Sequence, residues 1–211
     1  MNGTNLRREI ENTNNCDYRV SLIIPIYNMA EWLDTCFRSI LNQSIDPQMV
    51  EVLMIDDGSE DNSLEIMKRY SERYSNFKWY TKENGGPAQA RNFGIKHATG
   101  KYLMYLDPDD YLGKNTIESV CNFFDRHYDE IDVVTYKIIP IKDGEEQDLH
   151  FRYEVLKSQG VYDLTEPENS FICHTTMNTC VKNKFEKNVL FSENLFYHED
   201  QKYNIDTLKE K

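Results

Sequence analysis

Several features that would define a protein class are missing from this chain of 211 residues. No stretch approaches the roughly 20 apolar residues of a membrane span, and the polar first residues do not resemble a secretory signal peptide. The five cysteines are odd in number and lack the short spacings of a zinc or redox motif. No Gly-x-Gly-x-x-Gly motif occurs, which removes the usual dinucleotide and kinase fingerprints. We therefore expect a cytoplasmic protein with reduced thiols.

Basic residues are also scarce. The chain has 24 Lys and Arg against 36 Asp and Glu, so its formal net charge is −12. Surfaces that follow nucleic acid or anionic lipid need clustered Lys and Arg, and this balance argues against both partners. Hydrophobic residues make up 39% of the chain, enough for one folded core. Any anionic ligand must therefore be held by a local device.

Residues 20 to 111 alternate short apolar runs rich in β-formers with amphipathic helical patterns. This alternation predicts an α/β fold with a mainly parallel sheet flanked by helices. We expect strands at residues 20–26, 51–55, 77–80 and 101–106, and helices at 30–42, 64–74 and 88–98. Pro25 marks the end of the first strand. A helix at 117–124, a strand at 131–136 and a turn at Asp143-Gly144 should follow, after which the pattern weakens.

Acidic residues cluster where the predicted strands end. Ligands of open α/β sheets bind outside the carboxyl ends of the strands, where Asp56-Asp57 and Asp107-Pro108-Asp109 fall. Two carboxylates one residue apart suit Mg²⁺ or Mn²⁺, which also bind substrate phosphates. An isolated Asp-x-Asp is more often a polar turn. An EF-hand starting at Asp107 fails because Leu112 stands where the turn glycine belongs.

Four segments together resemble the family 2 glycosyltransferases with the GT-A (Rossmann-like) fold. The resemblance is strong over residues 20–112 and looser beyond. The segments, in order, are Val-Ser-Leu-Ile-Ile-Pro-Ile-Tyr-Asn at 20–28, Val-Leu-Met-Ile-Asp-Asp-Gly-Ser at 52–59, Asn-Gly-Gly-Pro-Ala-Gln-Ala-Arg-Asn-Phe-Gly at 84–94, and Tyr-Leu-Met-Tyr-Leu-Asp-Pro-Asp-Asp at 102–110.

The resemblance implies a nucleotide-sugar site. The residues that would bind the donor are Pro25, Tyr27, Asp57, Asn84, Gly86, Arg91 and Asp107. In this scheme the Tyr27 ring lies against the base and Asp57 accepts its ring N–H, a contact that favours uracil. Arg91 brings positive charge to the diphosphate. The alternatives are an ordinary turn at Asp56-Asp57 and at the glycines, and a surface ion pair for Arg91.

The resemblance also implies a metal and a base. Asp107 and Asp109 would hold Mn²⁺ or Mg²⁺, and Asp200, in Tyr197-His198-Glu199-Asp200, would deprotonate the acceptor hydroxyl. The expected reaction is inverting transfer from a nucleotide sugar, in particular a UDP-sugar. A Glu-Asp pair opening a helix also interacts favourably with the helix dipole, so the pair alone does not establish a base.

The resemblance divides the chain into three parts. We expect a polar arm at 1–19, a nucleotide-sugar-binding half at 20–112 and a smaller acceptor-binding half at 113–211, truncated at its C-terminus because few residues follow Asp200. The acceptor would be a saccharide or lipid-linked saccharide of cell-surface polysaccharide or glycoconjugate synthesis. Membrane association, at the inner face, would need missing C-terminal residues or partners. The alternative function is a non-catalytic sugar-nucleotide-binding or interaction module with this fold.

Overall fold

A computed structural model describes residues 18–147, 179–183 and 190–192 of the chain. Its helices are α1 (Ala30–Leu41), α2 (Ser63–Arg73), α3 (Pro87–His97) and α4 (Thr116–Arg126), with a short 3₁₀ helix at Pro47–Met49. Its strands are β1 (Val20–Ile26), β2 (Val50–Asp56), β3 (Phe77–Thr81), β4 (Tyr102–Tyr105), β5 (Val133–Thr135), β6 (Ile141–Lys142), β7 (Glu145–Glu146) and β8 (Thr179–Lys182).

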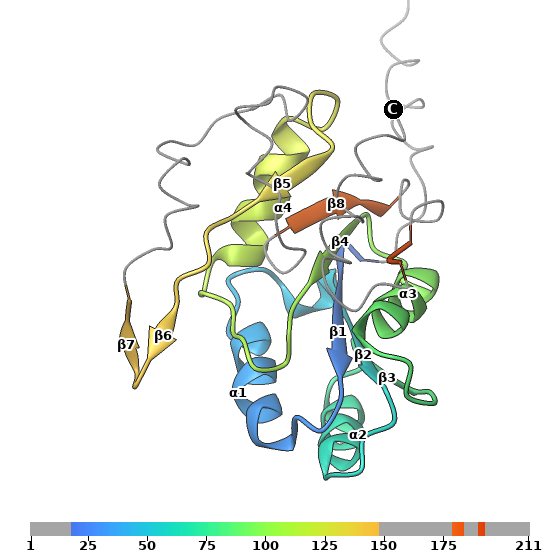
Figure 1. The fold of residues 1–211 in the computed structure, drawn as a ribbon. Helices are drawn as coiled ribbons and strands as arrows, with labels where there is room; N and C mark the ends of the chain where they lie inside the picture. The colour runs from blue at the N-terminus through green and yellow to red at the C-terminus, as the bar shows by residue number, and fades with distance from the viewer. Residues whose placement is uncertain (1–17, 148–178, 184–189, 193–211) are drawn as a thin grey trace, which may run out of the picture.

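Six strands form one mainly parallel sheet in the order β3-β2-β1-β4-β8-β5 (Figure 1). The strands β3, β2, β1 and β4 are parallel, whereas β8 runs antiparallel to both of its neighbours. Helices connect the parallel strands, as the alternating sequence pattern predicts. The predicted α/β class with a parallel sheet flanked by helices is therefore confirmed.

The helices cover both faces of the sheet. One hydrophobic cluster joins alternate residues of β1 and β2 to α1, α2 and α4, and a second joins the opposite strand faces to α3. All seven residues of β1 and of β2 are buried, which explains why their sequences are mostly apolar instead of alternating, with Ser21, Glu51 and Asp56 as the polar exceptions. Helix α3 packs closely because Gly94 has no side chain, and a Cβ there would lie 2.5 Å from Cγ2 of Ile23.

The amino edge of the sheet is held by a buried charge. Glu51, at the start of β2, is fully buried and accepts hydrogen bonds from Lys78 Nζ at 2.7 Å, from the Thr99 N–H at 2.8 Å and from the Ser21 hydroxyl. Buried carboxylates persist only when their oxygens are paired in this way. This network lies at the edge opposite to the predicted site and so has a structural role.

The structure agrees with most of the expected elements and adds two findings. The first strand has the predicted bounds, and Pro25 lies one residue before its end, where β1 still pairs with β2 but no longer with β4. Strand β8 comes from a stretch without a clear sequence period, and it inserts between β4 and β5. The hairpin of β6 and β7 turns at Asp143 and Gly144, both at positive φ, as expected. No helix in the described ranges could cross a bilayer.

Candidate nucleotide-sugar site

The carboxyl edge of the sheet gathers the predicted site segments. Ile26 pairs with Asp56 and Asp56 with Thr81, while Ile23 pairs with Tyr105, two residues before Asp107. The segments after β1, β2, β3 and β4 therefore leave the sheet at one edge. The structure thus brings together loops that are up to 80 residues apart in the sequence.

Asp57 organises the loop that leads into α3. It is only 3% exposed, and its carboxylate accepts hydrogen bonds from Lys82 Nζ at 2.5 Å, from the Gly86 N–H at 2.7 Å and from the Gly85 N–H at 3.0 Å. Gly86 has φ +87°, a left-handed conformation that favours glycine. The two glycines therefore present both backbone N–H groups to one carboxylate, and the loop is tied to the end of β2.

The turn that follows β2 is held by hydrogen bonds of Asp56 and by close packing of Gly58. Asp56 accepts the Ser59 N–H at 3.0 Å and the Thr81 hydroxyl at 2.8 Å, which closes the turn after β2. Gly58, at φ +80°, passes so close to the next loop that a Cβ would lie 3.1 Å from the backbone nitrogen of Asn84. Asn84 itself is exposed at this edge. The two loops hence pack backbone against backbone, which leaves little freedom to either.

The loop after β1 is braced against the same turn. Asn28, at φ +54°, donates its backbone N–H to the Ser59 hydroxyl at 3.0 Å and accepts the Glu60 N–H at 2.8 Å. Pro25 is buried within β1, but the Tyr27 side chain, one residue beyond the strand, is 45% exposed. A large aromatic ring held at the rim of a rigid loop is available to a ligand, as the sequence predicts for a base.

An ion pair connects α3 with the segment after β4. Arg91 is 4% exposed, and its guanidinium donates to Oδ1 of Asp107 at 3.0 Å. The same guanidinium lies over the ring of Phe191, 5.4 Å from its centroid. The surface ion pair considered for Arg91 is therefore wrong, because the guanidinium is buried. Asp57 and Asp107 therefore both bind the segment of α3, the first through the Gly86 N–H before the helix and the second through Arg91 within it.

Three carboxylates crowd the turn after β4. Asp109 is exposed, whereas Asp110 is partly buried and donates its N–H to the Asp107 carbonyl at 3.0 Å. Burial, followed by the negative charges of Asp109 and Asp107, raises the pKa of Asp110 to about 6. The turn therefore concentrates negative charge at the edge where the sequence predicts a cation.

The donor set of this turn fits a hard divalent cation only in part. Asp107 and Asp109 supply carboxylate oxygens, the ligands that Mg²⁺ and Mn²⁺ prefer. In the parts of the chain that the structure describes, however, no group of three or more His, Cys, Asp or Glu side chains is arranged to hold a metal. A cation here would need further ligands, and the phosphate oxygens of a nucleotide are the usual ones. The predicted base, Asp200, lies outside the described residues.

Three residues of this region were not predicted from the sequence. Lys82 neutralises Asp57, and Asn92 clamps the chain at Phe191, whose N–H it accepts at 2.8 Å and whose carbonyl it binds at 3.0 Å. Lys82 directly follows β3 and lies two residues beyond the end of the predicted strand, which was the available signal. Asn92 and Phe191 are 99 residues apart, and no local pattern indicates their contact.

Comparison with known proteins identifies relatives of this chain. The family described as Glycosyl transferase family 2 matches residues 21–188. The minor teichoic acid biosynthesis protein GgaB of Bacillus subtilis is 36% identical over 196 residues, which cover 90% of this chain and 21% of GgaB. The poly(ribitol-phosphate) beta-glucosyltransferase of Bacillus spizizenii is 34% identical over 115 residues, which cover 54% of this chain and 18% of that protein.

A solved structure shares the fold. The crystal structure of S. aureus TarS 1-349 in complex with UDP superposes with a TM-score of 0.71 at 25% identity, covering 90% of this chain and 54% of that one. The chain thus spans about a fifth of the two Bacillus relatives and about half of TarS 1-349. Because the family match covers most of the chain, from β1 past β8, the chain belongs to glycosyl transferase family 2.

Proposed function

We propose that this chain carries the donor-binding and catalytic region of an inverting glycosyltransferase. It would transfer a sugar from a UDP-sugar to a hydroxyl of a cell-surface polymer. The observation that carries the proposal is the coupled edge, where Asp57, the glycine loop, Arg91 and Asp107 form one connected unit beside the exposed Asp109. The UDP complex of TarS supports a UDP-sugar donor, and the name of GgaB, a teichoic acid biosynthesis protein, supports a cell-surface polymer as the acceptor.

Each predicted residue has a role that its position allows. The exposed ring of Tyr27 would stack on the base, and Asn84 and Gly86 would contact the nucleotide sugar from the loop that Asp57 holds. Asp57 already accepts from three donors, with the Gly85 N–H in reach of both carboxylate oxygens, so the uracil N–H would share an oxygen with one of them. Pro25 would shape the pocket from within β1.

The chemistry would be a single displacement at the anomeric carbon. The acceptor hydroxyl has a pKa far above 7, and the carboxylate of Asp200 would take its proton in the transition state. Asp107 and Asp109 would hold Mn²⁺ or Mg²⁺ together with the diphosphate, and the ion would neutralise the charge that develops on the leaving nucleoside diphosphate. Arg91, already placed beside Asp107, would assist as preorganised positive charge.

The test separates binding from catalysis. Asp109→Asn should abolish the metal-dependent part of UDP affinity in a calorimetric titration with Mn²⁺, and Glu83→Gln, an exposed carboxylate near the same edge, is the matched control. Asp200→Asn should keep UDP affinity and lose transfer. Unchanged UDP and Mn²⁺ affinity in Asp109→Asn would remove the metal assignment. Binding of UDP-sugars without turnover by the unmodified protein would favour the non-catalytic module instead.

A further inference from the structure

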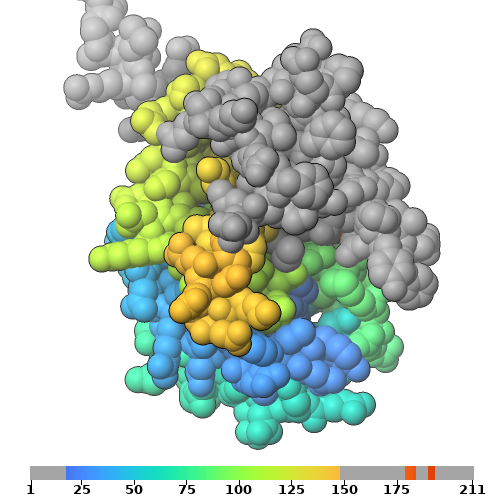
Figure 2. Space-filling model, turned by 60° about the vertical axis from the view of Figure 1, so that its left-hand side comes forward, coloured from blue at the N-terminus to red at the C-terminus, as the bar shows by residue number. Residues whose placement is uncertain are grey.

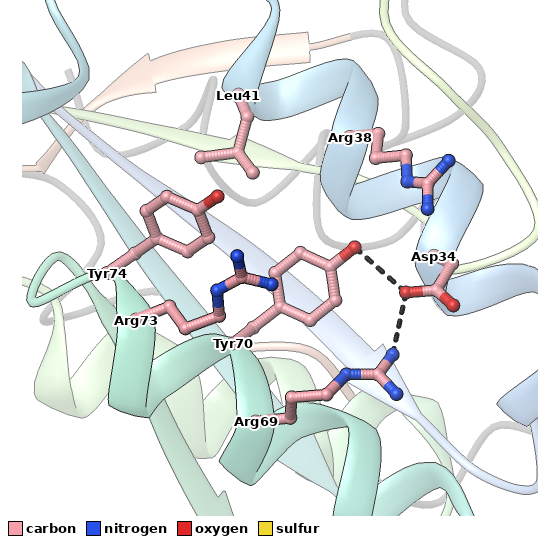
Figure 3. A pocket seen from close by; sticks show the side chains of 7 residues that line it. All are labelled: Asp34, Arg38, Leu41, Arg69, Tyr70, Arg73 and Tyr74. Carbon is pink, nitrogen blue, oxygen red and sulfur yellow. Dashed lines mark hydrogen bonds and ion pairs between the residues drawn. The ribbon is translucent and has the colours of Figure 1, made fainter.

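A pocket separate from the carboxyl edge opens between α1 and α2 (Figure 3). Its volume is about 390 Å³, within the range of small-ligand sites. Both helices start at the carboxyl edge, and Arg38 stands eight residues into α1, about 12 Å along the helix axis. The lining residues are Asp34, Arg38 and Leu41 of α1 and Arg69, Tyr70, Arg73 and Tyr74 of α2.

The pocket is basic on an acidic protein. Three guanidinium groups line it against one carboxylate, whereas the whole chain carries a net charge of −12. Arg69 pairs with Asp34 at 2.8 Å, but Arg38 and Arg73 form no ion pair with any residue in the described ranges. Asp34 is thus the one carboxylate among the lining residues, and it faces three guanidinium groups. Such local positive charge on an acidic protein attracts anions to this pocket.

The pocket is held in shape before any ligand arrives. The Asp34 carboxylate accepts the Tyr70 hydroxyl at 2.9 Å and Arg69 at 2.8 Å (Figure 3). The hydrogen bond from Tyr70, aided by the charges of Arg69 and Arg38, lowers the pKa of Asp34. The Tyr70 ring is buried against Phe37, with centroids 4.9 Å apart. The carboxylate therefore stays charged at neutral pH and links α1 to α2 beside the pocket.

The chemistry of the lining indicates a phosphate-bearing ligand. Guanidinium groups bind phosphate oxygens through planar pairs of N–H donors. The rings of Tyr70 and Tyr74, which stack with centroids 6.1 Å apart, also line the pocket (Figure 3), and the partly exposed Tyr74 ring can pack against a polyol or sugar. A membrane surface is a poorer fit, because lipid-binding patches contain about four to eight basic residues. The pocket has three, set in a cavity.

We propose that this pocket binds a phosphodiester group of the acceptor, a polyol-phosphate chain of the kind that the name of the Bacillus spizizenii relative prints. The inference rests on the proposed function and specifies the acceptor class. A group bound in the pocket is separate from the donor site, and only a chain-like acceptor reaches both. The pocket then holds the polymer while one of its hydroxyl groups is glycosylated at the carboxyl edge.

The test compares two double variants of the protein. In Arg38→Gln with Arg73→Gln only exposed side chains are changed and the pair of Arg69 and Asp34 is left intact, so we expect the fold to be kept. The control, Lys96→Gln with Arg126→Gln, also removes two positive charges, but from exposed positions on α3 and α4. The probes are a poly(ribitol phosphate) oligomer, inorganic phosphate, phosphatidylcholine vesicles containing phosphatidylglycerol, and UDP with Mn²⁺.

The expected result is selective. The pocket variant should bind the oligomer at least tenfold more weakly than the control, as the loss of charge-assisted hydrogen bonds implies, with a weaker dependence on salt. Both variants should bind UDP equally. Equal oligomer affinity in the two variants would overturn the inference, as would a loss seen only with vesicles, or equal losses with oligomer and inorganic phosphate. Failure of the unmodified protein to bind UDP would refute the proposed function alone.

Discussion

Asp57 offers the sharpest test of how the site is built. In Asp57→Asn the shape is kept but one carboxylate oxygen becomes an N–H donor, which cannot accept from Lys82 or from the backbone of Gly85 and Gly86. At least one of these donors then faces another donor in a site that is 3% exposed. We expect the free energy of unfolding to fall by about 2 to 4 kcal/mol, because charge-assisted hydrogen bonds are lost and Lys82 is left without its counter-ion.

The structure limits how large this loss of stability can be. Complete loss of a buried ion pair costs about 3 to 5 kcal/mol, but the Lys82 side chain is 17% exposed and can reach water. Urea unfolding followed by circular dichroism measures the free energy of unfolding of each variant. Glu83→Gln, which removes an exposed charge one residue from Lys82, is the control and should change this free energy by less than about 0.5 kcal/mol.

A double-mutant cycle isolates the pair. If the partly buried Lys82 charge destabilises the fold once Asp57 is neutralised, Lys82→Met should reduce the free energy of unfolding less in the Asp57→Asn background than in the unmodified protein. The coupling energy between the two substitutions should be about 1 kcal/mol or more. Equal unfolding free energies for Asp57→Asn and Glu83→Gln would refute the reasoning. A coupling energy of zero would leave the backbone hydrogen bonds as the whole effect.

Three further substitutions test the frame around the site. Burial would raise the pKa of Glu51, but its hydrogen bonds outweigh this and hold it below the ordinary value, so its stabilisation is present at neutral pH and lost as pH falls through the folded-state pKa. In urea unfolding, the free energy of unfolding should fall less between pH 7 and pH 4 for Glu51→Gln than for the unmodified protein. Gly94→Ala, whose Cβ meets Ile23, should cost about 1 to 3 kcal/mol in the same assay. Asn92→Ala, which frees both backbone groups of Phe191, should cost a similar amount and increase amide hydrogen exchange at that residue.

Each of these has a matched control or a contradicting outcome. Glu145→Gln removes an exposed carboxylate and should leave the pH dependence of stability as it is. Gly144→Ala has open space around the added methyl but a φ of +80°, so it reports backbone strain without a clash. Protection of the Phe191 amide that survives in Asn92→Ala would show that packing against Tyr105 holds this segment, not the side-chain clamp.

Much of the fold could be predicted because its signals are local. Buried parallel strands need continuous apolar runs, and amphipathic helices need apolar residues three and four apart, so residues 20 to 126 carry their own pattern. The acidic residues after β2 and β4 could be assigned to one edge by the rule that parallel strands end together. Strand β8 could not be predicted, since four residues placed between β4 and β5 leave no period in the sequence.

What the sequence determined by itself is the order of strands and helices up to β5, the family resemblance, and the candidate set of Tyr27, Asp57, Arg91, Asp107 and Asp109. Local apolar periodicity and short motifs are sufficient for these. The tertiary structure decided which of those groups touch: that Asp57 binds the glycine loop, that Arg91 is buried against Asp107, and that three arginines of α1 and α2 line one pocket. Contacts between distant segments depend on how helices and strands pack, and packing is a property of the whole chain.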